Sequence, residues 1–252
     1  MRQRIAMLPK LTYLSTTKVT MATWSGHAEF FLIGTAWLVM TDDLEIDTTV
    51  SGLGGLDGIA VGTSQWVYLY LVSNAGTLAA IAHTNSPGDG APPSYTTHKC
   101  IGAVWIDGAG AVTKFDHVLP GVIRYRSFRQ ALSTAAGTDA APVALTLDSY
   151  VPKIATAVSA QLRGYASGGS SYGYVHTWVD GEEQVAGGGV NDDSVAAHVA
   201  CYQNVQDQSA LTTSDIPIPD AETTRQVQYQ RVPSVGSLNF WVNIQGWLQS
   251  PQ

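Results

Sequence analysis

The chain is short of charged residues. Asp, Glu, Lys and Arg make up 13% of its 252 residues, about half the share usual in a soluble globular domain. A surface with so few charges consists of Thr, Ser, Asn, Gln and Gly, or is hidden against other subunits. Basic residues are the scarcer kind, because 13 Lys and Arg face 20 Asp and Glu and give a net charge of −7. This balance argues against a nucleic-acid partner, which requires clustered Lys and Arg.

Cysteine is scarce, and no membrane segment is evident. Cys100 and Cys201 stand far apart and outside any C-x-x-C spacing, so a zinc or redox site has no support. Two buried thiols are the commoner outcome for such a pair, and one disulfide stays open. Residues 1–10 lead into polar, Thr-rich sequence, so we expect no signal peptide. The most apolar run, residues 30–40 (FFLIGTAWLVM), is about half the ~20 residues of a spanning helix and predicts a buried strand pair without membrane insertion.

Strand patterns, by contrast, recur along the whole chain. The clearest is residues 65–72 (QWVYLYLV), followed by the turn SNAG and residues 77–83, a combination that predicts a β-hairpin. Both faces of its first strand carry large side chains, so both must be covered. We therefore expect this hairpin at the centre of a β-sandwich, with Leu69 buried. Either the amino-terminal strands or a neighbouring subunit would supply one of the covers.

Helical periodicity is nearly absent. Residues 128–136 (FRQALSTAA) predict at most a short helix, bracketed by Gly137 and Pro142. Alternating apolar residues return from residue 143 to the closing segment 238–247 (LNFWVNIQGW). Strands at such regular spacing predict an all-β fold, an antiparallel β-sandwich or jelly roll. We expect an amino-terminal strand-rich attachment region at residues 1–50 and a jelly-roll-like appendage domain at residues 51–252.

Motifs for catalysis are lacking. Neighbouring carboxylates occur as the doublets Asp42-Asp43, Glu182-Glu183 and Asp192-Asp193. Adjacent residues of a strand point to opposite faces, so a doublet does not flank a sugar as paired glycosidase carboxylates do. The histidines show no metal-binding spacing. GSSYG at residues 169–173 matches G-x-S-x-G in letters, but it lies in a loop of Gly and Ser and not at the strand-to-helix turn that a nucleophile elbow requires. We predict no catalytic, cofactor-binding or metal-binding residues, and no enzyme activity.

Aromatic residues cluster around a loop of Gly and Ser at residues 164–174. The candidates for surface recognition are Tyr165, Tyr172, Tyr174 and Trp178, because aromatic rings supply contact area while Gly and Ser supply adaptability. The alternative, which is the commoner outcome, is that alternate members lie on the inner face of a strand. Four further tryptophans are predicted to be core or subunit-interface anchors: Trp66, Trp105, Trp241 and Trp247.

Several segments resemble a known family. They are GLDG at residues 55–58, QWVYLYLV with its SNAG turn, PGDGAPPSYTTHK leading into CIGAVWIDGAG, IPIPD at 216–220 and FWVNIQGW at 240–247. From residue 47 onward the chain resembles a β-rich domain of tailed-bacteriophage tail fibres, neck or head appendages and related virion proteins. The resemblance implies a virion structural protein, a fibre, appendage or decoration subunit assembled in the bacterial cytoplasm. It also implies a homotrimer that contacts other virion proteins and holds no cofactor.

Two other functions stay open. A carbohydrate-binding module would act as a monomer, whereas the low charge and seven tryptophans predict self-association. A tailspike-type polysaccharide-degrading enzyme usually has a longer repetitive β-helix, and no repeat of 20 to 30 residues occurs in this chain. Host-surface attachment, with surface glycans as partners, is compatible with the virion function.

Overall fold

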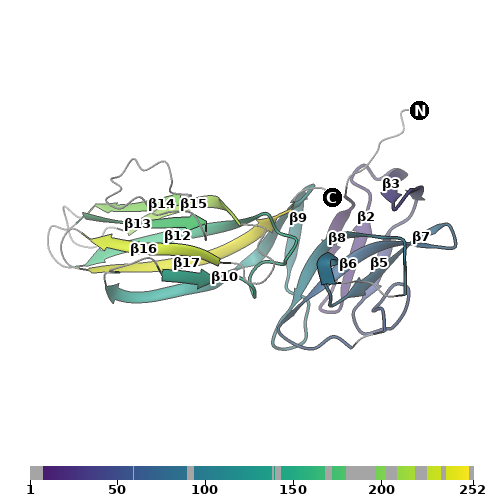
Figure 1. Ribbon diagram of the computed structural model, residues 1–252, viewed down its shortest axis with the longest axis horizontal. Coiled ribbons are helices and arrows are strands. Elements are labelled where there is room, and N and C mark those ends of the chain that lie inside the picture. Colours follow the sequence, from purple (N-terminus) through teal and green to yellow (C-terminus); the bar gives the residue numbers. More distant parts are fainter. Residues whose placement is uncertain are drawn as a thin grey trace. The chain divides into compact units, whose positions relative to one another are not determined.

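The computed structural model describes residues 8–58, 60–89, 94–137, 139, 143–167, 172–179, 197–202, 209–218, 226–233 and 237–249. The chain forms two compact units (Figure 1): Met1–Arg126 with Pro152–Ile154 and Gln249–Gln252, and Ser127–Val151 with Ala155–Leu248. Within the described residues every regular element is a strand, apart from one 3-10 turn at Pro87–Asp89. The predicted all-β fold is confirmed.

Three antiparallel arrangements make up the first unit. One sheet has the order β10-β9-β1-β2-β5, from the start of β10 (Val122–Gly137) through β9 (Phe115–Leu119), β1 (Lys10–Tyr13) and β2 (Lys18–Ala22) to β5 (Leu44–Asp47). A second has the order β7-β6-β8, with β7 (Thr77–His83), β6 (Gln65–Asn74) and β8 (His98–Ile106). The third is the hairpin of β3 (Glu29–Ile33) and β4 (Ala36–Met40), a strand pair as expected but buried on one face only.

The hairpin β6–β7 forms, and β6 is the middle strand of its sheet with Leu69 buried as predicted, while β7 is an edge strand. Strand β6 pairs with both neighbours, and all its residues from 67 to 72 are buried, Leu69 at 0% exposure. Ala75 and Gly76 form the two-residue turn with φ of 50° and 83°, the left-handed geometry that suits the twist of a hairpin. A Cβ on Gly102, the partner of Leu69 in β8, would lie 2.5 Å from Leu11 Cδ1. The amino-terminal strand β1 therefore covers the Leu69 face.

The outer edge of β7 is closed by the glycine-rich segment 51–58. Gly54 N–H donates to the Ala80 carbonyl and Asp57 N–H to the Ala82 carbonyl, both at 2.9 Å, while Ala82 N–H donates to the Gly55 carbonyl at 2.8 Å. A Cβ at Gly55 would collide with Val50, so the chain passes there only because the residue is glycine. A loop thus satisfies an edge that would otherwise accept another strand.

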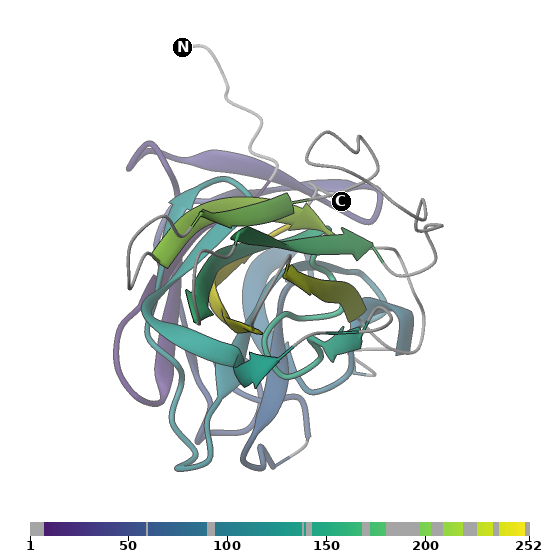
Figure 2. The ribbon, with the colours of Figure 1, turned by 90° about the vertical axis from the view of Figure 1, so that its left-hand side faces the viewer.

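The second unit is a jelly roll (Figure 2). Its strands after β10 are β11 (Val143–Thr146), β12 (Ala157–Ser167), β13 (Tyr172–Val179), β14 (Ala197–Tyr202), β15 (Ser209–Pro217), β16 (Gln226–Pro233) and β17 (Ser237–Leu248). They form two sheets, β15-β12-β17-β10 and β11-β16-β13-β14. The first strand of the unit therefore pairs with the last (β10 with β17), the second with the seventh (β11 with β16), the third with the sixth (β12 with β15) and the fourth with the fifth (β13 with β14). This is a long hairpin rolled into two facing sheets, which defines the jelly roll.

Two sequence-based expectations differ from the structure. The chain divides after Arg126, not at residue 50, because β1, β2 and β5 pair within the sheet that contains β9. Residues 128–136 belong to β10 and form no helix. Of the four tryptophan anchors, Trp247 is buried, whereas Trp66 and Trp105 are half-buried with their rings 5.3 Å apart, and Trp241 is also half-buried. No helix among the described residues has the length and apolarity to cross a membrane.

Candidate functional site

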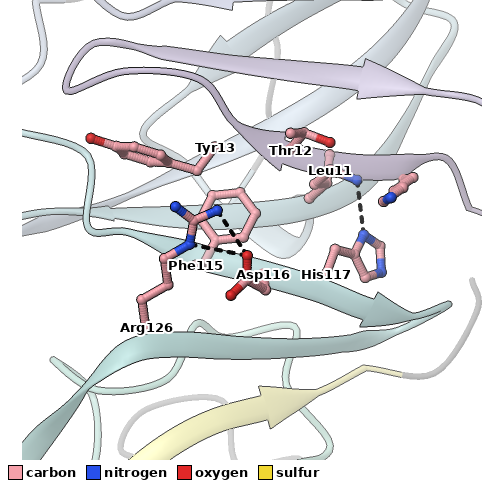
Figure 3. Close-up of a pocket in the computed structure, with 8 residues that line it drawn as sticks. Leu11, Thr12, Tyr13, Phe115, Asp116, His117 and Arg126 are labelled. Atoms are coloured by element: carbon pink, nitrogen blue, oxygen red, sulfur yellow. Dashed lines mark hydrogen bonds and ion pairs between the residues drawn. The ribbon is translucent and has the colours of Figure 1, made fainter.

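A pocket of about 200 Å³ lies in the first unit between β1, β9 and the start of β10 (Figure 3). Its lining consists of Lys10, Leu11, Thr12, Tyr13, Phe115, Asp116, His117 and Arg126. The ladder between β1 and β9 has one Cα pair, Thr12 with Asp116. The pocket therefore lies where these two strands separate.

An ion pair occupies the mouth of the pocket. Arg126 donates to Asp116 Oδ1 from Nε at 3.0 Å and from Nη2 at 2.8 Å, and its guanidinium lies 5.6 Å from the centre of the Tyr13 ring. Both charged side chains are about half exposed, so this pair contributes less than about 1 kcal/mol to stability. Asp116 neutralises Arg126, so Lys10 is the remaining cation of the described lining.

His117 at the back of the pocket is structural. Its Nδ1 accepts the Leu11 N–H at 2.9 Å, and the Gly121 N–H lies 3.2 Å from Nε2. Burial, assisted by the charge of Lys10 and opposed by the Leu119 carbonyl, lowers the pKa of His117 to about 4. Both ring nitrogens face backbone groups, so the imidazole substitutes for a missing backbone acceptor of β1. A general base requires a nitrogen that reaches substrate, and both nitrogens of this ring face backbone groups of the protein.

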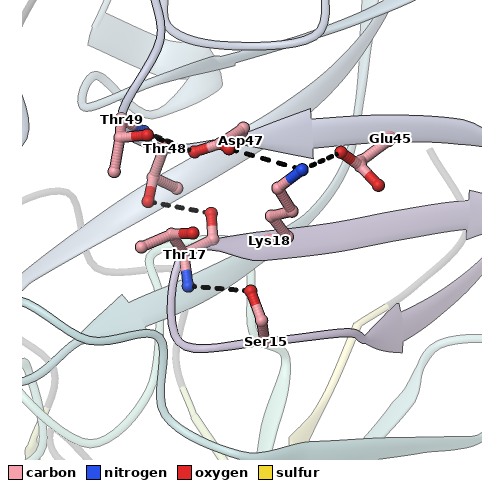
Figure 4. A network of polar contacts seen from close by, with 7 residues as sticks. All are labelled: Ser15, Thr17, Lys18, Glu45, Asp47, Thr48 and Thr49. Atoms are coloured by element: carbon pink, nitrogen blue, oxygen red, sulfur yellow. Dashed lines mark hydrogen bonds and ion pairs between the residues drawn. The ribbon is translucent and has the colours of Figure 1, made fainter.

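A second polar cluster joins β2 to β5 (Figure 4). Lys18 Nζ lies 2.6 Å from Glu45 Oε1 and 3.6 Å from Asp47 Oδ2, while Asp47 Oδ1 accepts from the Thr49 hydroxyl at 2.6 Å and the Thr49 N–H at 2.9 Å. The pKa of Lys18 is raised, chiefly by its hydrogen bond to Glu45. The pKa of Asp47 is lowered, chiefly by the hydrogen bond from the Thr49 hydroxyl. One ammonium contacts two carboxylates, and Asp47 is also held by Thr49, so the cluster fixes the turn after β5.

The outer face of the second unit presents different chemistry. We call it the β12–β17 face and define it by the pairs Tyr165 with Asn239, Arg163 with Trp241, and Gln161 with Asn243. The intervening residues form the core, because Ala160, Leu162, Phe240 and Val242 are all buried. Strand alternation therefore turns the six residues of the face away from the core.

Arg163 and Trp241 form the middle of this face. The guanidinium lies 5.3 Å from the centre of the indole ring, a cation–π contact. Arg163 is exposed and Trp241 half-buried, and in the described part of the chain no carboxylate pairs with Arg163. Beside them, Asn243 Nδ2 donates to Gln161 Oε1 at 3.4 Å. The face thus combines an oriented cation, an aromatic ring and planar amides, which suits recognition of a polar ligand.

The predicted recognition residues fall on both sheets. Tyr165 lies on the β12–β17 face and is half-buried. Tyr172, Tyr174 and Trp178 belong to β13 of the other sheet, where Trp178 pairs with Gln228. The structure therefore does not bring the four together as one set.

The side chains of Tyr172, Tyr174 and Trp178 lie outside the part of the structure that is described, although their strand is. Whether they face the surface or the core stays a prediction.

Sequence reasoning missed Arg163 and predicted Trp241 as a core or subunit-interface anchor. A usable signal was present in residues 238–247 (LNFWVNIQGW). Phe240, Val242 and Ile244 alternate there with polar residues, so Trp241 falls on the polar side of the strand. An isolated tryptophan on the polar side of an alternating strand is a candidate for the surface.

Other candidate residues carry little chemistry. Asp42 and Asp43 are exposed, while the doublets at residues 182–183 and 192–193 lie outside the described residues. Cys100 is a free, buried thiol, and burial raises its pKa to about 12. Among the described residues, no three of His, Cys, Asp and Glu gather as a metal site would require. Comparison of the chain with protein-family models, curated proteins and solved structures finds no match.

Proposed function

We propose that the chain is a structural protein of a tailed-bacteriophage virion, a fibre, appendage or decoration subunit on the tail, neck or head. The observation that carries the proposal is the jelly-roll topology of the second unit, an architecture found in viral capsid proteins and in lectins. Because one fold serves many functions, the resemblance of residues 47–252 to phage appendage proteins supplies the virion context.

We also propose that the protein self-associates as a homotrimer. The hairpin β3–β4 supports this, since Leu32, Trp37 and Val39 are 41%, 51% and 42% exposed. The register pairs Leu32 with Trp37 and Phe30 with Val39, so these residues share one face. The opposite face, which includes Phe31, is buried. Covering the exposed apolar face in an assembly would remove it from water.

Location on the particle tests the virion function. Antibody raised against the whole chain is applied to particles purified from the phage that encodes it, and the particles are viewed by electron microscopy. We expect label at one fixed position on each particle. Particles without this chain by immunoblot and mass spectrometry would refute the proposal.

Sedimentation tests the self-association. The parent should sediment as a trimer, and Trp37→Ser should shift it toward monomer because it places a hydroxyl in the apolar face. Phe128→Ser is the matched control, since Phe128 is 57% exposed but lies in β10 of the second unit. A parent that stays monomeric at micromolar concentration contradicts the trimer.

A free carbohydrate-binding module is the second candidate, favoured by the ring and amides of the β12–β17 face. It predicts a monomer that is absent from particles, so the two experiments above separate the candidates. In either case we propose no hydrolase or lyase activity. Turnover of host capsule or lipopolysaccharide that a single Asp or Glu substitution abolishes would overturn this.

A further inference from the structure

We infer that the β12–β17 face binds an acidic saccharide, with Arg163 holding the sugar carboxylate and with Trp241 and the amides contacting the ring and its hydroxyls. The inference deepens the host-surface recognition that the proposed function includes, and it rests on that function for its biological setting. It names a ligand class and a site.

Arg163 differs from two other described arginines in the group that it contacts. Two other arginines of the described chain, Arg126 and Arg231, each bind a carboxylate, at 2.8 and 2.6 Å from Nη2. Arg163 instead lies 5.3 Å from the centre of the Trp241 ring, and among the described residues no carboxylate pairs with it. A guanidinium presents a planar fork that matches a carboxylate in two parallel hydrogen bonds. Contact with the ring restricts the freedom of the Arg163 side chain and so lowers the entropy lost on binding.

Three amide side chains lie beside the Arg163–Trp241 pair. Gln161 with Asn243 lies on one side of the Arg163–Trp241 pair, and Asn239 lies on the other. Successive same-face pairs stand about 7 Å apart along a strand, so three pairs extend over about 14 Å. An amide both donates and accepts hydrogen bonds, as a sugar hydroxyl requires. The 3.4 Å bond between Asn243 and Gln161 is long, so exchanging it for bonds to a ligand costs little.

Charge narrows the ligand class. The chain has a net charge of −7, and Asp215 on the neighbouring strand β15 is exposed at a position paired with Ser159. Nucleic acid and other dense polyanions are repelled by this surface, and they require several cations. One oriented guanidinium among neutral amides instead matches one carboxylate on an otherwise neutral ring. A plain hexose would leave the Arg163 charge unused.

The test uses the full chain and matched sugars. The probes are oligosaccharides of galacturonic, glucuronic and sialic acid, each paired with its methyl ester, which keeps the ring and removes the charge. Binding is measured by titration calorimetry and by tryptophan fluorescence. We expect at least one acid to bind and its methyl ester to bind at least about tenfold more weakly. Added salt should weaken binding of the acid.

Variants place the binding on this face. Arg163→Gln should weaken binding of the acid about tenfold or more, because it removes the charge and the fork. Arg163→Lys keeps the charge and should recover part of the loss, and Trp241→Phe should weaken acid and ester together. Lys114→Gln, which removes an exposed cation of the first unit, is the control and should bind as the parent does. Melting temperatures confirm that each variant is folded.

Three results would overturn the inference: equal binding of acid and ester, unchanged binding by folded Arg163→Gln, or no binding of any acid at millimolar concentration. Its failure is distinct from failure of the virion proposal. Antibody label on particles together with absent sugar binding removes only the saccharide site. If the protein binds acidic sugars specifically but is absent from particles, the saccharide site is supported and the virion function is rejected in favour of a free carbohydrate-binding module.

Discussion

Acid should destabilise the first unit through His117. Burial favours the neutral imidazole, so the pKa of His117 is about 4 in the folded protein against an ordinary value of 6.5. The resulting stability is fully present above pH 6.5 and is lost as the pH falls from 6.5 to about 4. Each unit of pKa difference corresponds to about 1.4 kcal/mol. We therefore expect His117 alone to remove about 3 kcal/mol from the free energy of unfolding.

The geometry explains why protonation is costly. A neutral imidazole already carries one N–H, and Nδ1 is the nitrogen that accepts from Leu11. Protonation of Nδ1 would place a second N–H against the Leu11 N–H. The substitution His117→Asn removes the titration while placing an oxygen close to the position of Nδ1, so the Leu11 hydrogen bond can persist. The exposed His27 supplies the control variant, His27→Asn.

Urea unfolding at several pH values, followed by tryptophan fluorescence, measures the effect. His117→Asn should lose about 3 kcal/mol less than the parent between about pH 7 and pH 4, while His27→Asn should follow the parent. The pKa of His83 is also lowered, mainly by burial, but this contribution is common to all three proteins and cancels. Parallel profiles for the parent and His117→Asn would refute the reasoning.

The remaining predictions concern stability. Leu69→Ala should cost about 2 to 5 kcal/mol in urea melts, because the side chain is 0% exposed; a loss under about half a kcal/mol would show an exposed site. Asp139→Asn should cost about 3 kcal/mol, since Arg231 donates to both Asp139 oxygens, at 2.7 and 2.6 Å, and would keep a nearly buried charge. That hydrogen bonding lowers the pKa of Asp139, so the parent loses this stability as acid protonates the carboxyl, and the variant should not. Gly121→Ala should lower the melting temperature, because its φ is 79° and the new Cβ would collide with the Gln249 carbonyl; an unchanged melting temperature would contradict this.

Local patterns were enough to predict much of the fold. Alternation and turn chemistry are properties of neighbouring residues, so the hairpin around Ala75-Gly76 and the burial of Leu69 could be derived from sequence. Residues 128–136 were ambiguous for the same reason, because a short segment of Ala, Leu and Gln is compatible with a helix. The pairing of β10 with its neighbours β17 and β9 makes this segment a strand, and such pairing is a long-range contact.

The site was harder to predict than the fold. Arg163 and Trp241 are 78 residues apart in sequence, and only the register between β12 and β17 brings them together. His117 likewise gains its role from Leu11, 106 residues away. The domain boundary failed for a related reason, because composition changes at residue 50 while the contacts divide after Arg126.

The second unit is inserted into the chain of the first, which also takes in the short segment Pro152–Ile154. At the return of the chain, Gln249 N–H donates to the Gly121 carbonyl at 2.9 Å, and its side-chain amide donates to the Ile101 carbonyl at 3.2 Å. The chain therefore leaves and re-enters the first unit at neighbouring points, a geometry that permits exchange of an inserted domain. A jelly roll exchanged at these two points would have to bring residues that replace Pro152–Ile154 in the first unit.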